Sequence, residues 1–92
     1  MTIAEMNIAC ALRHIETLRQ HGAQVLGSNG RRTELNSFFY DTAKDECLLK
    51  GYEAICYELF LPGIENRLMI AIHRDGRVDT GSEKNVIMCL ER

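Results

Sequence analysis

A helix at the start of the chain is the feature that most constrains the fold. Thr2-Ile3-Ala4-Glu5 fits a capping box, in which a threonine hydroxyl and a glutamate carboxylate bind amide groups left unpaired at a helix start. Gly22 marks the other end, because glycine readily adopts the left-handed conformation that terminates helices. The sequence therefore predicts an amphipathic helix over residues 2–21. Its apolar stripe recurs at helical spacing and consists of Ile8, Ala11, Leu12, Ile15 and Leu18.

Segments with the pattern of β-strands follow this helix and offer a surface that covers its apolar stripe. Gly27-Ser28-Asn29-Gly30 is a turn cluster between the first two segments. Asp75-Gly76 predicts a tight primed hairpin turn, because Asp and Gly tolerate positive φ. A polar turn is expected over residues 81–85. We expect strands over residues 23–26, 33–40, 52–61 and 68–73, a further one starting at Arg77-Val78, and a last one over 86–90.

The segment 41–51 is ambiguous in sequence. Asp41 or Thr42 would cap a short helix that ends at Gly51, whereas Cys47-Leu48-Leu49 would begin a strand. We favour the short helix. The predicted fold class is thus α+β, with an N-terminal amphipathic helix packed on an antiparallel β-sheet of four to five strands and a second short helix. At 92 residues the chain has room for one hydrophobic core, so we expect a single domain over 1–92.

Charge and composition exclude several classes of protein. A net charge of −2 and a pI near 5.9 argue against a general nucleic-acid binder, whose surface is usually strongly basic. The first residues lack the basic start of a secretory signal, and no apolar stretch is long enough to span a bilayer, so we expect a cytoplasmic protein with no membrane partner. Four cysteines lack any C-x-x-C pair, which predicts free thiols packed in the core: Cys10, Cys47, Cys56 and Cys89.

The histidines do not form a recognisable catalytic or metal site. His14 and His21 lie two helical turns apart, about 10.5 Å along the axis, which is too far to share one metal ion. Nothing in the sequence places Cys56 or Cys89 beside His73, so we expect His73 to be an exposed residue at a strand end. We therefore predict no catalytic residues, no metal, no cofactor and no small-molecule substrate.

Charged residues gather in two kinds of surface. Arginines lie at two turns, where a rigid fork of N–H donors suits phosphate or carboxylate recognition: Arg31 and Arg32, with Asn29 beside them, and Arg74 and Arg77. A second group is acidic and suits a basic partner: Asp41, Asp45 and Glu46. The alternative for both groups is that they only keep loops and a helix face solvated.

The whole chain resembles the small phage-encoded anti-CRISPR proteins, especially inhibitors of type I-F surveillance complexes. The likeness rests on the capped helix, the compact antiparallel sheet, the mild acidity and the loop Gly27-Ser28-Asn29-Gly30-Arg31-Arg32. It contains no diagnostic motif. The resemblance implies a non-enzymatic protein in the bacterial host cell that binds the assembly of Cas proteins and guide RNA and blocks target DNA recognition. The arginines would then contact guide-RNA phosphates or acidic Cas surfaces, and the acidic group would contact basic Cas surfaces. The alternative is a small adaptor, chaperone or toxin-neutralising protein that acts by protein–protein binding.

Overall fold

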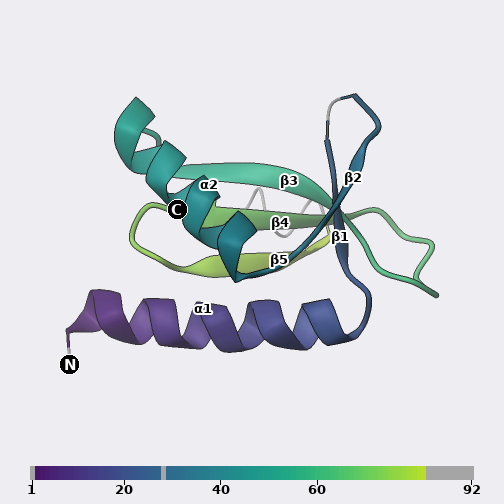
Figure 1. Cartoon of the computed structure of the whole chain (residues 1–92), viewed down its shortest axis with the longest axis horizontal. Coiled ribbons are helices and arrows are strands. Elements are labelled where there is room, and N and C mark those ends of the chain that lie inside the picture. Colours follow the sequence, from purple (N-terminus) through teal and green to yellow (C-terminus); the bar gives the residue numbers. More distant parts are fainter. Residues whose placement is uncertain (1, 28, 83–92) are drawn as a thin grey trace.

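The computed structural model describes residues 2–27 and 29–82 and confirms the predicted α+β fold (Figure 1). An N-terminal helix and a second helix accompany a five-stranded antiparallel sheet. The predicted last strand over 86–90 lies outside the described residues. In chain order the elements are α1 (Ile3–Gln20), β1 (Gln24–Leu26), β2 (Arg32–Glu34), α2 (Ser37–Lys50), β3 (Ala54–Phe60), β4 (Leu68–His73) and β5 (Val78–Ser82).

The first helix agrees with the prediction. The backbone N–H of Glu5 donates to Thr2 Oγ1 at 3.1 Å, and the Thr2 hydroxyl donates to Glu5 Oε1 at 3.0 Å. The glutamate thus binds the capping hydroxyl itself. Gly22 follows the helix with φ 81°, the left-handed conformation expected there. On the apolar stripe, Ala11 and Ile15 are fully buried.

The second helix corrects the prediction for residues 33–40. The strand expected there ends at Glu34, and α2 begins at Ser37, before Asp41 and Thr42. Asn36 is the capping residue, since its side-chain oxygen accepts the N–H of Phe39 at 2.8 Å. The helical choice for 41–51 is confirmed, and Gly51 ends α2 with φ 73°. The buried residues Tyr40, Ala43 and Cys47 recur at helical spacing.

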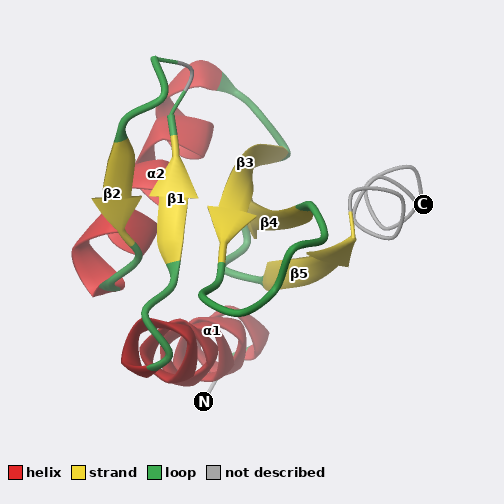
Figure 2. Cartoon of the chain, turned by 90° about the vertical axis from the view of Figure 1, so that its right-hand side faces the viewer, coloured by secondary structure: helices red, strands yellow, loops and turns green. Residues whose placement is uncertain are grey.

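The strand order is β2-β1-β3-β4-β5 (Figure 2). β1 pairs with the C-terminal half of β3, where Leu26 lies opposite Glu58, whereas Ala54 at the other end of β3 lies opposite His73. In the strand order, the β1–β2 hairpin and the β4–β5 turn belong to opposite edges of the sheet, and they lie on opposite sides of the molecule in Figure 1.

The β4–β5 turn confirms the predicted hairpin but not its turn type. His73 N–H donates to Arg77 O at 2.9 Å, and Gly76 N–H donates to His73 O at 3.0 Å. Of the turn residues only Gly76 has a positive φ, 96°. This geometry is a three-residue loop with a left-handed glycine. The turn expected over 81–85 is also wrong in its first part, because Gly81 and Ser82 belong to β5.

Both helices cover the same face of the sheet. Tyr57, Ile70 and Thr80 stand in one row across β3, β4 and β5, so their side chains point to one side. The ring of Phe39 on α2 contacts Tyr57 at 4.9 Å between centroids, and His14 on α1 contacts Thr80 at 2.9 Å. This face carries the core of the described residues, which includes Val25, Leu35, Tyr40, Leu59, Ile70 and Ile72.

The expectation of cysteines in the core is correct only for Cys47. Cys10 and Cys56 are exposed, and all three thiols are free, as predicted. Cys56 lies on the sheet face that points away from the helices, because its neighbour Tyr57 points toward them. Cys89 lies outside the described residues.

Candidate interaction surfaces

The β1–β2 hairpin is shaped by Asn29 and presents Arg31. The backbone N–H of Arg31 donates to Asn29 Oδ1 at 3.0 Å, and Gly27 N–H donates to Arg31 O at 2.8 Å. The predicted contact residue Asn29 thus serves the turn through its oxygen. Arg31 is exposed, and no carboxylate of residues 2–27 or 29–82 lies within ion-pair distance of its guanidinium. This arginine retains all of its side-chain donors for a ligand.

Arg32 is held in place by an aromatic ring. Its guanidinium carbon lies 4.1 Å from the ring centroid of Phe60, reached from β2 across β1 to β3. The guanidinium lies over the ring, and its N–H donors form no ion pair with a carboxylate of the described residues, so they stay available for phosphate or carboxylate oxygens. The sequence did not predict Phe60 as part of this site. We call Asn29, Arg31, Arg32 and Phe60 the hairpin surface.

A groove lies beside the hairpin surface. Its volume is about 570 Å³, and Phe60 forms part of its wall. Glu58 and Arg67 form an ion pair within it at 3.5 Å. The groove therefore offers an apolar wall and charges of both signs next to the stacked Arg32. The remaining lining residues are Leu26, Leu59 and residues 63–66.

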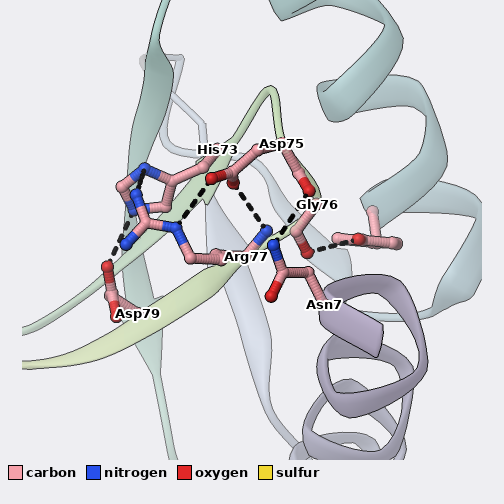
Figure 3. Close-up of polar contacts among 7 residues, drawn as sticks. Asn7, His73, Asp75, Gly76, Arg77 and Asp79 are labelled. Atoms are coloured by element: carbon pink, nitrogen blue, oxygen red, sulfur yellow. Dashed lines mark hydrogen bonds and ion pairs between the residues drawn. The ribbon is translucent and has the colours of Figure 1, made fainter. Parts of the chain in front are cut away.

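The predicted arginines of the β4–β5 turn both have partners within the protein, and Figure 3 shows those of Arg77. Arg77 donates from Nε to Asp75 Oδ2 at 2.9 Å and from its backbone N–H to Asp75 Oδ1 at 3.1 Å. Burial raises the pKa of Asp75, but these two bonds from Arg77 outweigh it and hold the pKa below its ordinary value. Arg74 Nη1 lies 3.7 Å from Glu53 Oε1, which is an ion pair. The two arginine pairs are not brought together, and the Arg74–Arg77 pair has less free capacity for a ligand.

His73 is buried, which corrects the expectation of an exposed histidine. It is only 5% exposed, and its Nε2 lies 2.8 Å from Asp79 Oδ2 (Figure 3). His73 is the last residue of β4, which has β3 on one side and β5 on the other. In addition, Arg77 Nη2 lies 3.5 Å from His73 Nδ1. No local pattern predicts this pairing, because His73 and Asp79 lie diagonally opposite each other across the hairpin.

Both helices also anchor the β4–β5 turn. The Tyr40 hydroxyl of α2 donates to Gly76 O at 2.6 Å in a buried position, and Asn7 of α1 donates to Asp75 O at 3.4 Å. A Cβ atom on Gly76 would lie 2.8 Å from Ile8 Cγ1, so this approach requires glycine. These contacts give the turn a structural role.

A second cleft separates α1 from β5. It has a volume of about 430 Å³, and its walls include Cys10, His14 and Asp79. His14 Nε2 forms a hydrogen bond with Thr80 Oγ1, and His21 Nδ1 lies 2.8 Å from Thr17 O. The two histidines therefore do not share a ligand. Within the part of the chain that the structure describes, no three His, Cys, Asp or Glu residues are placed to hold a metal ion. Burial raises the pKa of the Cys47 thiol, and partial loss of hydration raises the pKa of the otherwise exposed Cys56 thiol, which disfavours the reactive thiolate form of both.

The predicted acidic group divides into two parts on α2. Glu46 forms an ion pair with Lys50 at 2.7 Å. Asp41 and Asp45 are exposed, one helical turn apart, and no cation of the described residues pairs with them. Sequence analysis missed the apolar side chains around them, although the helical spacing of Phe38, Asp45 and Leu49 indicates a common face. We call Phe38, Asp41, Asp45, Leu48, Leu49 and Tyr52 the α2 outer face.

Comparison with known proteins adds no relative. A scan against protein-family models, a search of curated proteins and a search of solved structures each find no match. Neither helix of the described residues is long and apolar enough to cross a membrane. The resemblance to anti-CRISPR proteins therefore stays a prediction made from the sequence.

Proposed function

We propose that this chain is a non-catalytic inhibitor that binds a type I-F CRISPR–Cas surveillance complex and blocks target DNA recognition. The observation that carries the proposal is the hairpin surface, where Arg31 has no carboxylate partner among the described residues and Arg32 is stacked on Phe60. Two adjacent guanidinium groups on a turn are suited to the phosphates of a guide RNA.

The stacked pair would also recognise an RNA base. Single-stranded RNA is commonly bound by stacking of splayed bases on aromatic rings or on arginine planes. The guanidinium carbon of Arg32 already lies 4.1 Å from the centroid of the Phe60 ring, so this pair needs no ordering when a base arrives. Because the net charge of the chain is −2, the contact with RNA is local, and protein contacts supply the rest of the binding energy.

The test is an affinity measurement with a purified, guide-RNA-loaded type I-F complex. The variant Arg31→Glu/Arg32→Glu should bind at least about 100-fold more weakly than the parent, since each of the two charge-assisted contacts contributes about 1.5–3 kcal/mol. The salt dependence of the remaining affinity should also be shallower, because fewer phosphates are neutralised.

Two control variants separate the hairpin surface from a general effect of charge. Arg13→Glu reverses the charge of an exposed arginine on α1 and should bind like the parent. Arg74→Glu/Arg77→Glu should have a smaller effect than the hairpin variant, because both arginines already have intramolecular partners. Equal binding by the parent and the hairpin variant would reject the assigned contact. A parent that does not bind the complex would reject the proposed function and favour an adaptor, chaperone or toxin-neutralising protein.

A further inference from the structure

The α2 outer face exposes large apolar side chains to an unusual degree. Leu49 is 87% exposed and Phe38 is 77% exposed, although both lie on a regular helix. Leu48 on the same helix and Tyr52, just after the helix ends, are about half exposed. Single exposed apolar residues are common on proteins, but several on one helix face mark a surface that binds another macromolecule.

The apolar and acidic side chains lie on one side of the helix. At about 100° per residue, Phe38, Asp45 and Leu49 fall within about 40° of each other around the helix axis. Asp41 and Leu48 flank this stripe, and Tyr52 follows the end of the helix. The residues that α2 buries against the sheet, Tyr40, Ala43 and Cys47, lie on the other side. The outer face is thus distinct from the face that the fold uses.

The carboxylates specify the charge of the occupant. Asp41 and Asp45 lie between the apolar ends of the stripe and have no cation partner among residues 2–27 and 29–82, whereas the neighbouring Glu46 is paired with Lys50. Two uncompensated carboxylates within an apolar surface repel nucleic acid and favour lysine or arginine. A second copy of the chain is disfavoured, because a two-fold contact through this face would bring the same carboxylates toward each other.

We propose that the α2 outer face docks a basic segment of a partner protein. Lysine or arginine side chains of that segment meet Asp41 and Asp45, and its apolar side chains meet Phe38 and Leu49. The inference rests on the proposed binding function and names the chemistry of its protein contact. It does not depend on whether the hairpin surface binds RNA.

The first experiment is an NMR titration of the ¹⁵N-labelled full chain with three synthetic peptides. One peptide has a lysine- and arginine-rich centre with leucines on both sides, the second has glutamates in place of the basic residues, and the third has serines in place of the leucines. Only the first peptide should shift the amide resonances of residues 38–52. Shifts confined to other elements, equal binding of the acidic peptide, or no shift at all would overturn the proposal.

Matched variants test the two chemical contributions separately. Asp41→Asn/Asp45→Asn and Leu49→Ser should each weaken the peptide roughly tenfold, the effect of losing one hot-spot contact. Glu5→Gln/Glu16→Gln removes two exposed carboxylates on α1, outside the α2 outer face, and should leave the affinity unchanged. Unchanged far-ultraviolet circular dichroism of all variants excludes unfolding of α2 as the cause. Reversible dimerisation of the parent through α2, detected by sedimentation, would overturn the proposal in favour of a second copy.

The surveillance complex distinguishes this inference from the proposed function. If Asp41→Lys/Asp45→Lys binds the complex as well as the parent while Arg31→Glu/Arg32→Glu does not, the inference fails and the function stands. If the parent does not bind the complex but the basic peptide still maps to the α2 outer face, the type I-F function fails and the docking surface stands.

Discussion

At the scale of single residues, the hydroxyl of Tyr40 joins α2 to the β4–β5 turn. It is buried and donates to the carbonyl oxygen of Gly76 at 2.6 Å. Tyr40→Phe removes the donor and leaves that carbonyl without this partner, which should lower the free energy of unfolding by about 1–3 kcal/mol. Urea denaturation at pH 7 measures this loss. A variant as stable as the parent would contradict the structural role of the bond.

The same residue makes the stability depend on alkaline pH. Burial raises the pKa of Tyr40 from about 10 in the unfolded chain to about 12, with a smaller effect from Asp41 and Asp75. The folded state therefore favours the neutral phenol, so its contribution is complete below pH 10 and disappears as the pH rises through 12. The parent should lose more stability than Tyr40→Phe between pH 9 and pH 11. An equal loss in the two proteins would show that Tyr40 does not titrate in this way.

The burial of individual polar residues could not be predicted from the sequence. His73 is the last residue of a strand, a position that usually exposes a histidine. Its two ring nitrogens nevertheless contact Asp79 and Arg77, and the side chain is buried. Cys10 and Cys56 occur among apolar neighbours, and both are exposed. Their environment depends on which face of the sheet the helices cover, and this choice is made by long-range packing.

At the scale of secondary-structure elements, the start of α2 depends on one side chain. Asn36 Oδ1 accepts the N–H of Phe39, and this bond satisfies one of the amides left unpaired in the first turn. Asn36→Ala should cost about 1 kcal/mol, whereas Asn36→Asp should be neutral or stabilising, because aspartate caps as well and its charge favours a helix start. Thermal and urea denaturation test the order. Asn66→Ala, at an exposed loop position, is the control and should change the stability by less than about 0.5 kcal/mol.

The two helix starts explain what local sequence can and cannot predict. α1 begins with a threonine and a glutamate at capping-box spacing, and its predicted bounds agree with the structure within a residue or so. α2 has Phe39 where a capping box has glutamate, and three successive aromatic residues favour a strand. A helix rather than a strand forms here because it buries Tyr40, Ala43 and Cys47 together, so tertiary packing overrides the local preference.

At the scale of the whole molecule, the positions of the two candidate surfaces could be predicted only in part. The turn cluster at Gly27 indicated an exposed hairpin, and its arginines are exposed in the structure. The pairing of Arg32 with Phe60 joins residues 28 positions apart through the strand order β2-β1-β3, which no local pattern contains. Predicting the α2 outer face likewise requires knowing that the second helix begins at Ser37. Long-range strand order and helix packing therefore define both surfaces.

The two surfaces also predict how their substitutions combine. No ion pair or hydrogen bond among the described residues joins the hairpin surface to the α2 outer face, so their contributions to binding should be independent. Combining Arg31→Glu/Arg32→Glu with Asp41→Lys/Asp45→Lys should therefore weaken binding to the loaded surveillance complex by the sum of the two losses, within about 0.5 kcal/mol. Titration calorimetry with the four proteins measures this sum.

The prediction would be contradicted if the combined variant bound the complex no more weakly than the weaker-binding of the two separate variants. That result would mean that the partner uses one surface at a time. Additive losses would instead mean that both surfaces contact the complex at the same time, as expected of a target that combines RNA phosphates with basic protein side chains. A chain with a net charge of −2 is suited to such a target, because it can place arginines against the RNA and carboxylates against the protein that holds it.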